Sequence, residues 1–205
     1  GITAFDVIAE GRDRLGLDLV ILDHHEAEDE LPKANFVIDP KRQDDTSGFD
    51  MLAACGVVFL TCVALNTALR DKGFYEKNGL AEAPLKSWLD LVAFGTVCDM
   101  VPLRGPNRLL VKKGLEQLNQ SDNAGIKALC DVSKVDGVIS SSHLGFSLGP
   151  RINAGSRVHK SDIGAKILST DCEEEAINLA WLLNDCNDKR RAIEKDMLSH
   201  AVQLV

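Results

Sequence analysis

Several features that define other classes of protein are scarce in this sequence of 205 residues. Its six cysteines include no C-x-x-C pair, which argues against a zinc cluster or a disulfide framework and favours buried, reduced thiols. Glycine and proline are too few to suggest disorder. The longest apolar run, residues 51–69, is interrupted by Asn66 and by small and hydroxyl residues, so we predict a buried helix there and no membrane partner.

An excess of basic residues is also lacking. The net charge is −8, which counts against a generic nucleic-acid coat but not against an enzyme that grips phosphate through bound metal ions, because those cations reverse the local sign. No basic segment followed by an apolar one stands after Gly1, so no signal peptide is predicted and the cytoplasm is the expected location. With 45% hydrophobic and 26% charged residues, the composition is typical of a globular domain.

The order of elements predicts an α/β domain with a mainly parallel sheet flanked by helices, followed by a long C-terminal connecting helix. A first helix capped by Thr3 should end at Gly16, and residues 17–22 (LDLVIL) resemble a strand buried on both faces. A second short strand is expected at residues 35–38. Helices are expected at residues 49–70, 85–94, 107–118, 124–132 and from about 173 to the end, with a Ser- and Gly-rich loop at residues 140–157.

Asp23, His24 and His25 directly follow the first predicted strand. Ligands of parallel sheets bind beyond the carboxyl ends of the strands, and mixed imidazole and carboxylate ligands suit Mn²⁺, Zn²⁺ or Fe²⁺ better than Ca²⁺. A polar surface turn is the competing interpretation of this tripeptide, because tripeptides recur by chance. The sequence alone leaves both open.

Asp99 stands between two apolar stretches, where an isolated carboxylate would be costly to bury. It is interpreted either as a helix cap or as a metal ligand. In residues 149–157 (GPRINAGSR), Arg151, Asn153 and Arg157 form a set able to hold phosphate oxygens, although loops also carry arginine for solubility. His143, just before them, is more typical of a surface or capping residue.

The segments ILDHH, GTVCDMVPL and HLGFSLGPRINAGSR occur in an order that resembles RecJ-type exonucleases of the DHH phosphoesterase superfamily. The resemblance extends over nearly the whole chain. It implies metal-dependent hydrolysis of single-stranded DNA from the 5′ end, in DNA repair and recombination, with single-stranded DNA as partner and a two-metal site for Mn²⁺ or Mg²⁺.

The resemblance also implies roles for particular residues. His24 and Asp99 would ligate metal, His25 would face the substrate phosphate, and Asp23 would orient the site. Arg151, Asn153 and Arg157 would contact DNA phosphate, with the choice between the two arginines left open. One departure is small: the family usually has Ala-Ala-Gly-Arg where this chain has residues 154–157, AGSR.

A larger departure is that the sequence does not contain three further features of the family. These are an upstream D-x-D motif, an Asp just before the position of Gly1, and a C-terminal DHHA1 module. We therefore expect residues 1–170 to be a partial DHH domain and residues 171–205 to be a helix leading to an absent DHHA1-like domain. The chain alone should then be nearly inactive and should self-associate through an exposed sheet edge. Two alternatives are another DHH phosphoesterase acting on small nucleotides or oligonucleotides, and a non-catalytic RecJ-like replication scaffold.

Overall fold

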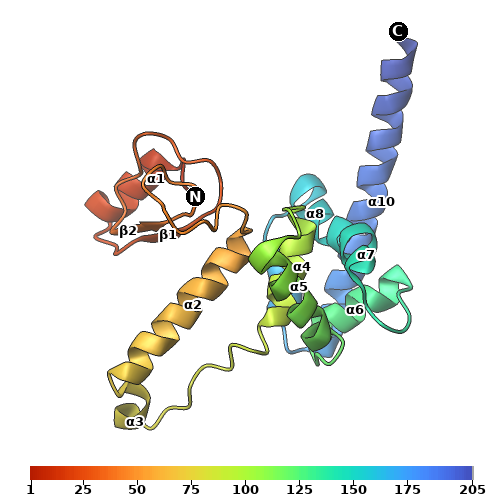
Figure 1. Cartoon of the computed structure of the whole chain (residues 1–205). Helices are drawn as coiled ribbons and strands as arrows, with labels where there is room; N and C mark the ends of the chain where they lie inside the picture. The colour runs from red at the N-terminus through yellow and green to blue at the C-terminus, as the bar shows by residue number, and fades with distance from the viewer. Residues whose placement is uncertain (205) are drawn as a thin grey trace. The chain divides into compact units, whose positions relative to one another are not determined.

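The computed structural model describes residues 1–204. It divides into two compact units, the first comprising Gly1–Gly114 and the second beginning at Leu115 (Figure 1). The predicted division at residue 170 concerns sequence modules rather than compact units, and it stays a prediction.

The sheet of the first unit contains two parallel strands in the described residues, β1 (Val20–Leu22) and β2 (Phe36–Ile38), with Ile21 opposite Val37. This pairing confirms the parallel sheet expected from the sequence. Ile21 is buried, whereas Val20 is 56% exposed, so the prediction of a strand covered on both faces is wrong. Successive side chains of a strand point to opposite faces, and only the face bearing Ile21 is covered here.

The first helix, α1 (Phe5–Ala9), continues into one turn of π-helix, η1 (Glu10–Arg14). Gly16 follows with φ of +64°, a left-handed conformation that ends the helix as predicted. Thr3 does not cap it. The N-cap position is held by Ala4, one residue later, and no side chain accepts a hydrogen bond there.

Four more helices complete the first unit: α2 (Ala54–Asp71), α3 (Phe74–Asn78), α4 (Leu89–Cys98) and most of α5 (Gly105–Leu118). The long helix α2 packs against α4 and β1, and it was expected to be buried. Instead it buries only Gly56, Val57 and Asn66. By length and composition α2 is apolar enough to cross a bilayer, which on its own is weak evidence.

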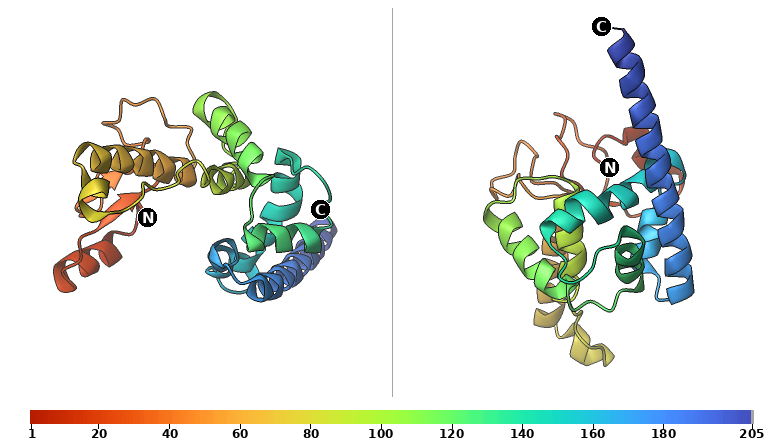
Figure 2. Two further views of the ribbon diagram at one scale, coloured as in Figure 1. Left: turned by 90° about the horizontal axis from the view of Figure 1, so that it is seen from below. Right: turned by 90° about the vertical axis from the view of Figure 1, so that its right-hand side faces the viewer.

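The second unit is helical in the described residues, with α6 (Ala124–Ser133), α7 (Ser141–His143), η2 (Leu144–Leu148), α8 (Gly149–Val158), α9 (Ile163–Ser169) and α10 (Glu173–Gln203). Helix α10 packs against α6, α8 and α9 and runs as one long helix, as predicted (Figure 2). Its first half buries Ala176, Ala180 and Leu183, whereas its last turns are exposed.

The predicted loop at residues 140–157 is wrong, because this segment is helical from Ser141 to Val158. Ser140 begins it as a capping box: its hydroxyl accepts the His143 N–H, and His143 Nδ1 accepts the Ser140 N–H at 3.2 Å. Leu144, Leu148 and Ala154 are fully buried. This burial offsets the low helix propensity of the glycines and serines between them.

A candidate metal and phosphate site

The Asp23-His24-His25 tripeptide lies at the carboxyl edge of the sheet, as the sequence predicted. Strand β1 ends at Leu22, and the Asp23 N–H continues the pairing by donating to the Ile38 carbonyl at 3.1 Å. Because the strands are parallel, the end of β2 meets the same edge. The turn is therefore held by backbone hydrogen bonds, which gives its side chains a fixed starting direction.

The carboxylate of Asp23 is buried and accepts four hydrogen bonds. Its Oδ2 accepts the Ile2 N–H at 2.6 Å, and its Oδ1 accepts the backbone N–H groups of His24 and His25 at 2.8 and 3.2 Å. The fourth comes from the His25 ring. Burial raises the pKa of Asp23, but these hydrogen bonds outweigh it and hold the pKa well below its ordinary value. Asp23 is thus an ionised group that organises the turn.

His25 is oriented by Asp23, since its Nδ1 lies 2.7 Å from Asp23 Oδ1. An ionised carboxylate only accepts hydrogen bonds, so Nδ1 carries the proton and Nε2 is directed away from Asp23. The His25 side chain is 72% exposed. Its ring lies beside that of His24, with centroids 4.5 Å apart. His25 therefore offers a solvent-facing nitrogen next to the more buried His24.

Asp99 follows the last turn of α4 and is the C-cap of that helix, so the helix-cap interpretation describes its backbone correctly. Its side chain is 39% exposed, and the expected cost of burial is correspondingly reduced. Met100 comes next with φ of +59°, and its side chain is exposed. The chain then returns to Asn107, whose fully buried side chain donates to the carbonyls of Pro102 and Met51 at 3.0 and 2.6 Å.

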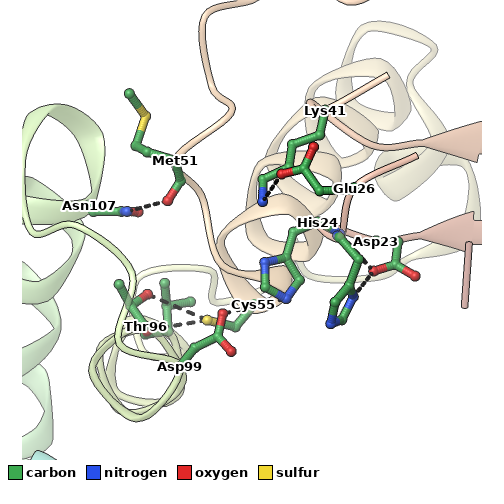
Figure 3. A network of polar contacts seen from close by, with 11 residues as sticks. Asp23, His24, Glu26, Lys41, Met51, Cys55, Thr96, Asp99 and Asn107 are labelled. Atoms are coloured by element: carbon green, nitrogen blue, oxygen red, sulfur yellow. Dashed lines mark hydrogen bonds and ion pairs between the residues drawn. The ribbon is translucent and has the colours of Figure 1, made fainter. Parts of the chain in front are cut away.

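His24 and Asp99 come together, with Nε2 of His24 3.4 Å from Oδ2 of Asp99. Figure 3 shows the imidazole and the carboxylate side by side near Cys55. Two ligand atoms that each lie about 2.1 Å from one cation are about 3 Å apart, so this separation fits a shared divalent ion. Within the described residues, no group of three or more His, Cys, Asp or Glu side chains is arranged to hold a metal. The pair therefore supplies part of a ligand set.

Two groups near this pair were not anticipated from the sequence. Cys55, on α2, places its Sγ 3.5 Å from Thr96 Oγ1 and 3.4 Å from the Val92 carbonyl, and burial raises the pKa of its thiol. Lys41, just beyond β2, forms a 3.0 Å ion pair with Glu26 (Figure 3). The signal for Lys41 was present, because residues 39–42 (DPKR) follow the second strand and so share the edge that carries His24.

The three residues predicted to contact phosphate lie on α8 in the second unit. Arg151 is half-buried and donates from Nε to Asn184 Oδ1 at 3.0 Å and from its terminal nitrogen to the Ser147 carbonyl at 2.7 Å. Burial lowers the pKa of Arg151. Asn153 and Arg157 are exposed. Arg151 thus ties α8 to α10, whereas Arg157 presents its guanidinium to solvent.

Comparison with known proteins identifies relatives of this chain. Residues 1–96 match the DHH family, N-terminal domain. Along its full length the sequence is similar to RecJ exonucleases. It is 39% identical over 206 residues to the single-stranded-DNA-specific exonuclease RecJ of Salmonella typhimurium, covering 100% of this chain and 36% of that protein. RecJ of Bacillus subtilis is 35% identical over 93% of this chain, which spans 22% of that relative.

Solved structures give the same result. The crystal structure of exonuclease RecJ bound to manganese superposes with a TM-score of 0.79 at 31% identity, covering 100% of this chain and 49% of that one. RecJ from Thermus thermophilus in complex with Mn²⁺ gives a TM-score of 0.77 at 33% identity, covering 98% of this chain and 28% of that one. The predicted fold is thereby confirmed. The chain spans little more than a third of the length of the Salmonella relative.

Proposed function

We propose that this chain is the part of a RecJ-type 5′-to-3′ exonuclease that carries half of its metal site. The whole protein would hydrolyse phosphodiester bonds of single-stranded DNA in DNA repair and recombination in the cytoplasm. The observation that carries the proposal is the 3.4 Å approach of His24 Nε2 to Asp99 Oδ2, beside the organised Asp23 turn. It is supported by the Mn²⁺ or Mg²⁺ bound in the solved RecJ structures.

In this proposal each residue of the turn has a separate task. His24 and Asp99 hold a divalent ion between them, with Mn²⁺ or Mg²⁺ as the cofactor. Two-metal phosphodiesterases use such ions to activate a water and to stabilise the leaving oxygen. Asp23 fixes the tautomer of His25 through the 2.7 Å contact, so that the unprotonated Nε2 of His25 can accept a proton from a group at the scissile phosphate.

The helix α8 contributes the phosphate contacts. Asn153 and Arg157 are exposed and suited to hold backbone oxygens of DNA. Arg151 already donates hydrogen bonds to Asn184 and Ser147. We propose that its contact with phosphate leaves these bonds in place, so that Arg151 continues to hold α8 against α10.

The test is hydrolysis of 5′-labelled single-stranded and duplex DNA by the full-length protein with Mn²⁺. His24→Ala and Asp99→Asn should each reduce the rate by more than about 100-fold, since even groups behind metal ligands contribute about 10- to 100-fold. His200→Ala is the matched control, because His200 is exposed near the end of α10. Undiminished hydrolysis by either site variant, or equal hydrolysis of the duplex, would contradict the proposal.

A second arm uses the 205-residue chain alone. Only two candidate ligands converge in the described residues, and metal affinity depends on the full set. We propose that the chain by itself has little or no activity. Robust Mn²⁺-dependent digestion of single-stranded DNA by the purified chain is the result that would refute this.

A further inference from the structure

Helices α2 and α4 approach each other so closely at Cys55 and Gly95 that a side chain at position 95 would force a displacement there. A Cβ placed on Gly95 would lie 2.8 Å from Cys55 Sγ and 3.2 Å from Cys55 Cβ. Non-bonded heavy atoms normally stay about 3.5 to 4.0 Å apart. Glycine is unfavourable inside a helix, so its presence in α4 is explained by this close contact.

The contact is also fixed in register. The Cys55 thiol donates to the Val92 carbonyl at 3.4 Å, one turn before Thr96, whose hydroxyl lies 3.5 Å from the same sulfur. Thr96 is fully buried. One side chain of α2 is therefore held by consecutive turns of α4, which opposes sliding of one helix along the other as well as separation.

Both helices lead directly to the two halves of the metal pair. Asp99 stands one turn after Gly95, and its backbone N–H donates to the Gly95 carbonyl at 2.9 Å. On the other side, α2 packs against β1, whose carboxyl end carries His24. The position of α4 against α2 is thus transmitted to the distance between Asp99 and His24.

We propose that Cys55 and Gly95 are positioning residues: their contact sets the separation of His24 Nε2 and Asp99 Oδ2. The functional meaning of that separation rests on the proposed metal site. The separation itself is set by the packing of α2 against α4, whether or not a metal binds. Figure 3 shows Cys55 beside Asp99 and the His24 ring, so a displacement of α4 away from Cys55 would carry the carboxylate with it.

The direct test is a pair of crystal structures of the 205-residue chain, Gly95→Ala and the double variant Gly95→Ala/Cys55→Ala. The added methyl group should lengthen the Nε2–Oδ2 separation by about 0.7 to 1.2 Å, the relief that the contact needs. Removing the sulfur in the double variant should return it towards 3.4 Å. An unchanged separation in Gly95→Ala, or a double variant as displaced as the single one, overturns the proposal.

The matched control is Gly164→Ala in the second unit, where a Cβ would meet Ile152 Cγ2 at 3.0 Å. It introduces similar crowding and should leave the pair unchanged. If Gly95→Ala does not fold, Cys55→Val crowds the same contact from α2 and is expected to give the same lengthening. No lengthening in Cys55→Val would then count against the proposal.

Mn²⁺ binding by the full-length protein, followed by the electron paramagnetic resonance of the free ion, gives the second readout. We expect Gly95→Ala to weaken binding about 10- to 100-fold, in the range of groups that orient metal ligands, and the double variant to recover most of the loss. A His24→Ala variant that binds as the parent does would overturn the proposed metal site, whereas the crystal structures would still decide the role of Cys55 and Gly95.

Discussion

Asp23 Oδ1 lies 2.7 Å from His25 Nδ1 and also accepts the backbone N–H of both histidines, so one carboxylate oxygen organises the entire turn. The turn and the direction of His25 therefore depend on a single ionised group. Because that group is buried and its pKa is shifted, its contribution can be measured without any assay of activity.

The pH dependence of the free energy of unfolding in acid should reveal the contribution of the Asp23 carboxylate. The pKa of Asp23 is lower in the folded chain than its ordinary value of 3.8, so the unfolded chain takes up the proton first and stability falls as the pH drops below about 4. Asp23→Asn should remove this part of the pH dependence and lower stability at neutral pH by about 1.5 to 3 kcal/mol. Urea unfolding at a series of pH values from about 6 down to about 2.5 measures both effects.

The result that would contradict this is a parent and an Asp23→Asn variant whose unfolding midpoints fall in parallel with acid. Asp122 offers a matched control, because its pKa is also lowered but its side chain is fully exposed and pairs with Lys127. Asp122→Asn should change the fall in stability at low pH only slightly.

Asn107→Ala should destabilise the first unit. The change leaves the carbonyls of Met51 and Pro102 without their donor in a buried place, at a cost of about 1 to 3 kcal/mol for such groups. The free energy of unfolding in urea measures the loss. Asn78→Ala is the control, since Asn78 is exposed and its side chain donates to the Phe74 carbonyl within one short helix, and its effect should stay within about 0.5 kcal/mol. Equal losses of unfolding free energy in the two variants would show that the buried hydrogen bonds of Asn107 contribute no more than the exposed one of Asn78.

Substitution of the two arginines of α8 should have different effects, one on DNA binding and the other on stability. Arg157→Ala should weaken binding of single-stranded DNA by the full-length protein and reduce the salt slope by about 1, as for one lost phosphate contact. Arg151→Ala should instead lower stability by about 1 to 3 kcal/mol, because it removes the links to Asn184 and Ser147. Fluorescence anisotropy at several salt concentrations and urea unfolding measure the two effects. An exchange of the two phenotypes would reverse the assignment.

The chain should self-associate through its sheet. Val20, Phe36 and Ile38 are 56%, 68% and 41% exposed on a two-stranded sheet, and such apolar strands pair readily with other chains. Light scattering should detect dimers or larger species at micromolar concentrations. Val20→Lys should reduce them, because a charge on an exposed strand opposes pairing. A clean monomer for the parent chain would contradict the prediction.

Much of the secondary structure was predictable because the patterns are local. The short strands before Asp23 and Asp39, and the helices at α5, α6 and α10, follow from apolar periodicity and from stop signals such as Gly16. The segment from Ser141 to Val158 was not, because its helix depends on burial of Leu144, Leu148 and Ala154 in the second unit. Local propensity of Ser and Gly pointed to a loop, and packing overrode it.

The site divides in the same way. The position of Asp23, His24 and His25 at a strand end could be derived from the sequence, but their approach to Asp99 could not, because it depends on how α2 lies against both β1 and α4. That expectation came only from resemblance. Arg151 illustrates the opposite case: the sequence marked it as a cation for phosphate, and its contacts with Asn184 and Ser147 became visible only in three dimensions.

At Met100, in the turn after Asp99, a substitution that raises the stability of the fold would also loosen the backbone that positions Asp99. A residue with a side chain gives up roughly 1 kcal/mol or more in the left-handed region, and Met100 has φ of +59° there with no burial to compensate it. Glycine at this position would recover that energy while making the backbone beside Asp99 more pliable. A search for thermostable variants would therefore favour Met100→Gly. The same variants would hold the Asp99 carboxylate less rigidly in position.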